Sequence, residues 1–381
     1  MDANAFTNPS GELRPLVGGG LAFIPAPLPP EHLDMAQLAI PVSEALQAMG
    51  ELKGAARRLA NPWLLIQPMQ RAEALATSAM EGTYTTMDQL VLEEAEVGAG
   101  SADAREVANF IRALDWASEQ IDAGVPIVHR LLCGAHERLL KGVRGASRRP
   151  GQYKRDQNMI GSPDGKVATA RFVPPPPDIT PDLMARLERF INEEERRSAF
   201  QAFVDIALVH YQFETIHPFA DGNGRLGRML ITLLAKKWGL LDHLLLYVSP
   251  ELEEQKERYI DCLFAVSARS AWEEWVAFFA ETVVRGSARI VDTIDRLVGL
   301  HEDFRARAAR AGRSANLQKV VDELFRIPVV TTPGVGALLG VTYVAARNVI
   351  EKLEKAGILS AIPGTRPQAW KAPAIINLVR R

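Results

Sequence analysis

The stretch from His217 to Arg228 constrains this chain more than any other part of its sequence. It reads His-Pro-Phe-Ala-Asp-Gly-Asn-Gly-Arg-Leu-Gly-Arg and is followed directly by an apolar run, 229–234, that is typical of a buried helix. A loop rich in glycine and asparagine at a helix start leaves backbone N–H groups available at the positive end of the helix dipole. The stretch therefore predicts a phosphate-binding loop that opens a helix.

Side chains of the same stretch suit phosphate-ester transfer. His217 can take a proton from a nucleophile, and Asp221 can hold a Mg²⁺ that bridges phosphates. A competing pattern is present, because residues 222–227 also match the dinucleotide fingerprint G-x-G-x-x-G. That fingerprint needs a β-strand immediately before it, and residues 215–221 contain a proline, a charge and no alternation. We therefore favour phosphate-ester transfer over dinucleotide binding.

The stretch resembles the signature of the Fic (Fic/Doc) family, H-P-F-x-[D/E]-G-N-G-R-x-x-R, at every fixed position. The resemblance implies a mainly α fold and an enzyme that transfers AMP from ATP, with Mg²⁺, to a Tyr, Ser or Thr hydroxyl of a target protein, which could be the enzyme itself. It implies that His217 is the general base, that Asp221 holds the metal, and that the two arginines hold the β- and γ-phosphates. The nucleotide-binding residues would be Gly222, Asn223, Gly224, Arg225, Leu226, Gly227 and Arg228.

Two further parts of the site follow from the resemblance. Residues 142–177 break the helical period, and Asp164-Gly165 between extended stretches predicts a β-hairpin. This hairpin is similar to the Fic flap, which implies backbone-led recognition around Ile160 and Gly161. The resemblance also implies an aromatic side chain beside the adenine, for which Tyr259 is the candidate. Burial of Tyr259 in the core is the alternative.

A second motif precedes the signature. Thr77-x-x-x-Glu81-Gly82 ends a predicted helix, and by itself it indicates a solvated glutamate before a capping glycine. Beside the signature, it is similar to the inhibitory [S/T]-x-x-x-E-[G/N] motif of Fic proteins that carry their own inhibitory helix. The resemblance implies that Glu81 pairs with Arg228 and occupies the donors that a γ-phosphate needs.

The remaining composition is ordinary. The net charge of −2 does not call for nucleic acid or an anionic membrane, and no stretch reaches eighteen uncharged apolar residues. Cys133 and Cys262 lie far apart, which together with the absence of a signal peptide favours a reducing, cytoplasmic location without a membrane. His129 and His136 lack a third ligand at metal-binding spacing, so we interpret both as structural.

We divide the sequence into an N-terminal arm and helical region with the inhibitory motif (1–100), a Fic-type helical core with a β-hairpin flap (101–305), and a C-terminal domain (306–381). Residues 1–30 are rich in glycine and proline and predict an extended arm. After a linker at 306–316, the C-terminal domain resembles a winged helix. Its predicted elements are helices at 317–325, 333–339 and from the N-cap Thr342 to 356, and strands at 358–362 and 368–372.

The C-terminal domain offers cations that a DNA-binding protein could use, but the whole chain is nearly neutral. We therefore favour a packing or dimerisation module, which leaves a homodimer open, over DNA binding. The cations and the amide in question are Arg347, Asn348, Lys352, Lys355 and Arg366. Two alternative functions stay open: a DNA-binding regulator whose Fic core senses a nucleotide, and a Fic enzyme that uses another nucleotide or removes AMP.

Overall fold

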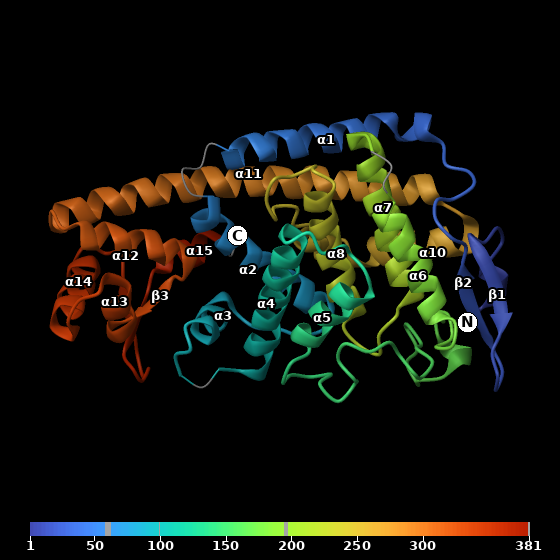
Figure 1. Ribbon diagram of the computed structural model, residues 1–381, viewed down its shortest axis with the longest axis horizontal. Coiled ribbons are helices and arrows are strands. Elements are labelled where there is room, and N and C mark those ends of the chain that lie inside the picture. The colour runs from blue at the N-terminus through green and yellow to red at the C-terminus, as the bar shows by residue number, and fades with distance from the viewer. Residues whose placement is uncertain (58–61, 99, 194–196, 380–381) are drawn as a thin grey trace. The chain divides into compact units, whose positions relative to one another are not determined.

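The computed structural model describes residues 1–57, 62–98, 100–193 and 197–379, and it is mainly helical (Figure 1). The helices are α1 (Met35–Arg57), α2 (Pro62–Met80), α3 (Met87–Glu94), α4 (Ala102–Asp122), α5 (His129–Leu139), α6 (Thr180–Asn192), α7 (Ala199–Ile216), α8 (Asn223–Lys237), α9 (Ser249–Glu254), α10 (Lys256–Arg269), α11 (Trp272–Ala311), α12 (Ala315–Arg326), α13 (Thr332–Leu339), α14 (Tyr343–Lys355) and α15 (Pro373–Val379). The strands are β1 (Gly11–Pro15), β2 (Leu21–Pro25), β3 (Val329–Thr331), β4 (Ser360–Ile362) and β5 (Ala369–Lys371).

The chain forms two compact units that do not follow the predicted domains 1–100, 101–305 and 306–381. The first unit contains Met1–Gly50 and Arg112–Gly286, and the second contains Glu51–Ile111 and Ser287–Arg381. These divisions fall inside α1, α4 and α11. A continuous helix runs across each boundary, so helical periodicity gives no sign of such a division.

Helix α7 lies at the centre of the first unit. Nearly all its residues are buried, as expected for a helix that is apolar on every side. It begins after Ser198, whose hydroxyl accepts a hydrogen bond from the Gln201 N–H (3.1 Å), and it packs against α6, α8 and β2. The indole of Trp275 donates a hydrogen bond to the Ala207 carbonyl (2.9 Å). The signature stretch therefore starts at the end of a rigidly packed helix.

The N-terminal arm is folded as a hairpin, so the prediction of an extended arm was wrong. Strands β1 and β2 pair antiparallel, and Gly18, Gly19 and Gly20 have the positive φ angles that their tight connection needs. Phe23 in β2 is fully buried, and its N–H donates to the Val173 carbonyl (2.9 Å). The high glycine and proline content of residues 1–30 favoured the prediction of an extended arm, although the apolar strand β2 is buried.

The predicted flap hairpin is reduced to one β-bridge. Ile160 and Phe172 exchange two backbone hydrogen bonds of 2.9 and 3.1 Å, without regular strands on either side. The predicted turn is present, with the Asp164 carboxylate accepting from the Lys166 N–H (3.1 Å). A short 3₁₀ turn at Val167–Thr169 replaces the second strand.

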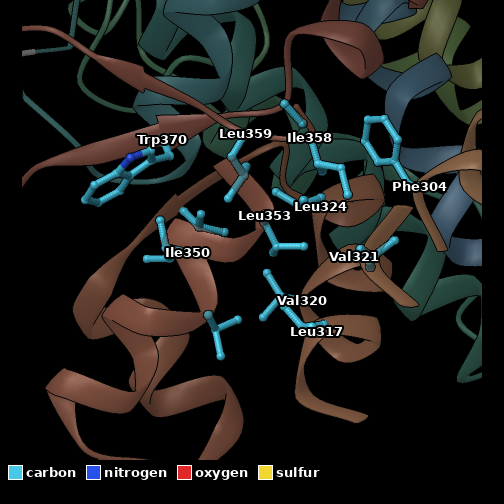
Figure 2. Close-up of a cluster of buried hydrophobic side chains, with 14 of the residues drawn as sticks. Phe304, Leu317, Val320, Val321, Leu324, Ile350, Leu353, Ile358, Leu359 and Trp370 are labelled. Carbon is cyan, nitrogen blue, oxygen red and sulfur yellow. The ribbon is translucent and has the colours of Figure 1, made fainter. Parts of the chain in front are cut away.

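The second unit packs α2 and α3 with the C-terminal elements. A buried cluster joins α12, α14 and β5 through Leu324, Leu353 and Trp370 (Figure 2). The element order α12–β3–α13–α14–β4–β5 contains every predicted helix and strand and adds β3, which sequence analysis missed. The Thr342 side chain caps α14 as predicted. Helix α11 extends to Ala311, so much of the predicted linker is helical. The winged-helix assignment itself stays a prediction.

Candidate nucleotide-binding loop

His217 ends α7 in a left-handed conformation that is uncommon for a residue other than glycine (φ 50°, ψ 61°). This conformation turns the chain sharply out of the helix, while the His217 N–H still donates to the Phe213 carbonyl (3.0 Å). The imidazole is half-buried, and its Nδ1 lies 3.2 Å from the Glu214 carbonyl oxygen. A carbonyl only accepts, so Nδ1 carries a hydrogen in this contact. With that hydrogen on Nδ1, proton transfer from a substrate would use Nε2.

The loop after His217 is closed by the Asn223 side chain. Its amide oxygen accepts from the Phe219 N–H (2.8 Å), and its amide nitrogen donates to the Phe219 carbonyl (2.8 Å). Asn158 donates a second hydrogen bond to the same carbonyl (2.8 Å). The Phe219 ring is fully buried. Phe219 thus anchors the loop. Both polar atoms of the Asn223 side chain bind the Phe219 backbone, so any contact of Asn223 with an anion would come from its backbone N–H.

His136, on α5, packs against the loop and binds it through a hydrogen bond. Its ring stacks on Phe219 with centroids 3.9 Å apart. The Gly151 N–H donates to His136 Nδ1 (2.9 Å), so His136 Nε2 carries the hydrogen that it donates to the Asp221 carbonyl (2.8 Å). Burial lowers the pKa of His136 to about 4, which keeps the ring neutral as this arrangement requires.

Sequence analysis assigned His136 a structural role but gave no sign that it supports the signature. No local signal could have shown this, because the partners lie 85 residues apart in the chain.

Lys154 fastens the beginning of the loop. Its backbone N–H donates to the Pro218 carbonyl (2.8 Å), and its Nζ donates to the Ile216 carbonyl (3.0 Å). Burial lowers the pKa of Lys154 to about 7. Residues 151–158 and α5 therefore hold the carbonyls of Ile216, Pro218, Phe219 and Asp221.

Asp221 is the candidate metal ligand, and its surroundings suit Mg²⁺. The carboxylate is partly exposed; one oxygen accepts from the Gly222 N–H (2.7 Å) and lies 3.6 Å from the Arg225 guanidinium. A side chain at Gly145 would come within 2.9 Å of the other oxygen, Oδ2, so the glycine keeps that oxygen accessible. Among the described residues no group of three His, Cys, Asp or Glu could hold a metal. Mg²⁺ typically binds one or two carboxylates plus phosphate oxygens, so a bound triphosphate would have to complete this site.

Residues 222–228 form the start of α8 as predicted, but their side chains differ in role. Gly222 adopts a left-handed conformation (φ 79°) as the N-cap, without a side chain that would block the first backbone N–H groups. Leu226 is fully buried. A Cβ on Gly227 would lie 2.2 Å from a Glu214 carboxylate oxygen, so Gly227 permits the close approach of α7 and α8. Leu226 and Gly227 thus serve packing.

Arg225 and Arg228 also lie on α8, and both are buried in the first unit. Tyr259 is buried too, and its hydroxyl lies 2.8 Å from His210 Nε2. That is the interior position the sequence left as the alternative to an adenine contact. Ile160 is half-buried.

Glu81 is exposed directly after α2, before Gly82 with its predicted positive φ of 80°. It belongs to the second unit, so its pairing with Arg228 stays a prediction.

The comparisons with known proteins agree with the signature. A family model described as "Fic/DOC family N-terminal" matches residues 40–119, and one described as "Fic/DOC family" matches residues 126–235. The second match contains the whole loop built above. The chain belongs to the Fic/DOC family.

Similar proteins carry related names. A probable protein adenylyltransferase of Aquifex aeolicus (strain VF5) is 30% identical over 139 residues, which is 36% of this chain and 38% of the relative. The protein adenylyltransferase Fic of Drosophila melanogaster is 29% identical over 200 residues, 51% of this chain and 37% of the relative. The matches thus span less than two fifths of these curated relatives.

Solved structures share the fold. A Fic family protein from Desulfovibrio desulfuricans G20 superimposes with a TM-score of 0.57 at 22% identity, covering 90% of this chain and 98% of the other. Fic-1 from C. elegans gives a TM-score of 0.51 at 17% identity, covering 70% and 75%. Within the described residues, no helix combines the length and apolar character needed to cross a membrane.

Proposed function

We propose that this chain transfers AMP from ATP to a hydroxyl side chain of a protein. The observation that carries the proposal is the placement of His217, which ends α7 directly before the loop with its Nδ1 3.2 Å from the Glu214 carbonyl oxygen, where an imidazole can serve as a general base. This base stands next to a helix start with a bare glycine cap and a partly exposed carboxylate. The curated relatives named protein adenylyltransferases support the choice of reaction.

In the proposed reaction, the target hydroxyl oxygen attacks the α-phosphorus of ATP and its proton passes to His217 Nε2. The bond from the α-phosphorus to the bridging oxygen breaks, and pyrophosphate leaves with that oxygen. Backbone N–H groups at the start of α8, from Gly222 onward, stabilise the charge that develops on the phosphate. Arg225 and Arg228 would hold the β- and γ-phosphates, a task for which guanidinium groups are suited.

Asp221 would hold Mg²⁺ through Oδ2, because Oδ1 is already engaged by the Gly222 N–H. When bound, the ion neutralises phosphate charge in the transition state. Ile160, Gly161 and the backbone beside them would align the target segment by strand addition, since the Ile160–Phe172 bridge lies outside any regular strand in the described part of the chain. The proposed protein partner therefore presents an extended segment. Separately, the free cysteines Cys133 and Cys262 agree with a reducing, cytoplasmic location.

Replacing His217 by Ala tests the base. We expect the variant to label a target or itself with AMP about 10²–10⁴-fold more slowly, because a positioned base contributes that much. His32→Ala is the matched control, since His32 is exposed and precedes α1, away from the loop in sequence. Equal labelling by His217→Ala and wild type would remove the base assignment, and so the proposal.

We also propose that Glu81 restrains the reaction by occupying a guanidinium that the γ-phosphate requires. Its support is its exposed position after α2 and the left-handed Gly82 that follows. Glu81→Gly should raise the initial rate of labelling.

A matched control is Glu96→Gly, because Glu96 is likewise exposed just beyond a helix, α3. If both variants label at the wild-type rate, Glu81 does not inhibit.

A further inference from the structure

Positive charge is concentrated at the C-terminal end of the chain. Residues 306–381 contain twelve Lys and Arg against four Asp and Glu, which gives +8, whereas residues 1–305 carry −10. The net charge of −2 is thus the sum of an acidic part and a basic part. The near-neutral charge of the whole chain is therefore no argument against nucleic-acid binding by the C-terminal segment. Such a local charge excess is the usual electrostatic footprint of a polyanion-binding surface.

Part of this charge lines one open groove within the second unit. The groove has a volume of about 600 Å³ and lies between the ends of α11 and α14. Its cations are Arg307, Arg310, Lys352 and Lys355, and only Arg307 has a carboxylate partner, Asp303 at 2.7 Å, within the described residues.

The helix ends themselves do not account for this concentration. Three of the four groove cations have no carboxylate partner among the described residues. The C-termini of α11 and α14 carry roughly one negative charge between them, so about two positive charges remain unbalanced in the groove.

The groove continues along the solvent face of α14. Val344, Asn348, Lys352 and Lys355 are all exposed and, at about 100° per residue, fall within roughly 80° of one another. Glu351 lies near this stripe, but Arg347 neutralises it at 2.9 Å. The stripe thus changes from apolar to amide to cationic from its N-terminal to its C-terminal end.

The elements around α14 leave this face open. Helix α13 ends at the left-handed Gly340 and packs against α14 as a helix-turn-helix pair. On the opposite side, Ile350 and Leu353 point into the buried cluster (Figure 2). Arg366 is exposed in the turn between β4 and β5, a hairpin that reaches α14 through the Arg347 contact on the Trp370 ring (4.6 Å).

We propose that this surface binds double-stranded DNA, with α14 in the major groove and the four groove cations on phosphates. A duplex suits it better than a membrane or an acidic peptide. A helix fits the width of the major groove, an exposed Val can contact a thymine methyl, and an exposed Asn can pair with adenine. The cations at one end of the same stripe would then fall on the flanking backbone.

The test is fluorescence anisotropy of the 381-residue chain with a labelled duplex of mixed sequence, titrated with salt. Four phosphate contacts predict a slope of log K against log salt of about −3.6. The double substitution Lys352→Gln and Lys355→Gln should reduce the magnitude of this slope by about 2. Arg186→Gln with Arg189→Gln removes the same charge from exposed positions on α6 and should leave the slope unchanged. Circular dichroism confirms that each variant is folded.

Val344→Ser with Asn348→Ala should weaken binding to preferred sequences, selected from a random duplex pool, without changing the salt slope. The proposal is overturned if the wild type does not bind duplex at low salt, or if the lysine and control variants have equal slopes. It is also overturned if single-stranded RNA or anionic lipid vesicles compete more strongly than unlabelled duplex.

Discussion

At the scale of single residues, two histidines at the loop lie in different surroundings and suit different tasks. His217 is half-buried with its Nδ1 on the Glu214 carbonyl, whereas His136 is buried and uses both nitrogens to hold the loop. The signature predicts the first role, that of a general base for His217. The second role arises only when α5 packs beneath the loop, and a lone histidine in a helical pattern has no feature that would reveal it.

The buried histidines make stability depend on pH. Burial lowers the pKa of His136 to about 4 and that of His210 to about 3, below the value of about 6.5 expected in the unfolded chain. The unfolded chain therefore binds more protons between these values, and stability falls as pH drops from 6.5 toward 4.

His136→Asn should remove about 2 kcal/mol of the stability difference between pH 7 and pH 4.5, measured by urea unfolding. An identical pH dependence in variant and wild type would show that His136 is not held neutral.

At the scale of elements, the sequence predicted those with local signals. Thr342 and Gly82 occupy the cap positions expected of them, because capping depends on residues within one turn. The β1–β2 hairpin and the missing flap strands depend on what packs against them, so local patterns misjudged both. Similarly, Pro41 and Pro68 lie inside continuous helices, although proline usually interrupts them.

Gly227 provides a test of the contact between α7 and α8. Gly227→Ala places a Cβ within 2.2 Å of Glu214 and 3.1 Å of Phe213, so we expect a loss of about 1–3 kcal/mol in unfolding free energy and slower AMP transfer. Gly299→Ala in α11 meets nothing within 4 Å and should instead stabilise by about 0.5–1 kcal/mol. Thermal unfolding of both variants measures the contrast, and a stabilising Gly227→Ala would refute the close contact.

At the scale of the whole molecule, the second unit joins the helix before Glu81 to the C-terminal elements. Helix α2 packs against α12 and α15. The buried Arg71 pairs with Glu94 (2.6 Å) and donates to the Arg326 carbonyl (2.5 Å), while Lys371 pairs with Asp88 of α3 (2.6 Å). If Glu81 inhibits, its position therefore depends on the C-terminal elements that also present the basic groove.

Arg71→Met should loosen this connection, because it removes the buried guanidinium that pairs with the half-buried Glu94 carboxylate at 2.6 Å. We expect AMP labelling to rise in the same direction as in Glu81→Gly, but by less. Arg105→Met is the control, since Arg105 is paired with Glu93 at an exposed position. The connection would be contradicted if Arg105→Met labelled faster than the wild type. It would also be contradicted if Arg71→Met labelled no faster than the wild type.

The central claim is that His217 directs a hydroxyl to the α-phosphorus of ATP. Incubating the chain and a cell lysate with ATP labelled on the α-phosphate, or separately on the γ-phosphate, tests it most directly. The account predicts protein labelling from the α-phosphate only, lost in His217→Ala. Labelling from the γ-phosphate, or α-labelling that persists in His217→Ala, would contradict it.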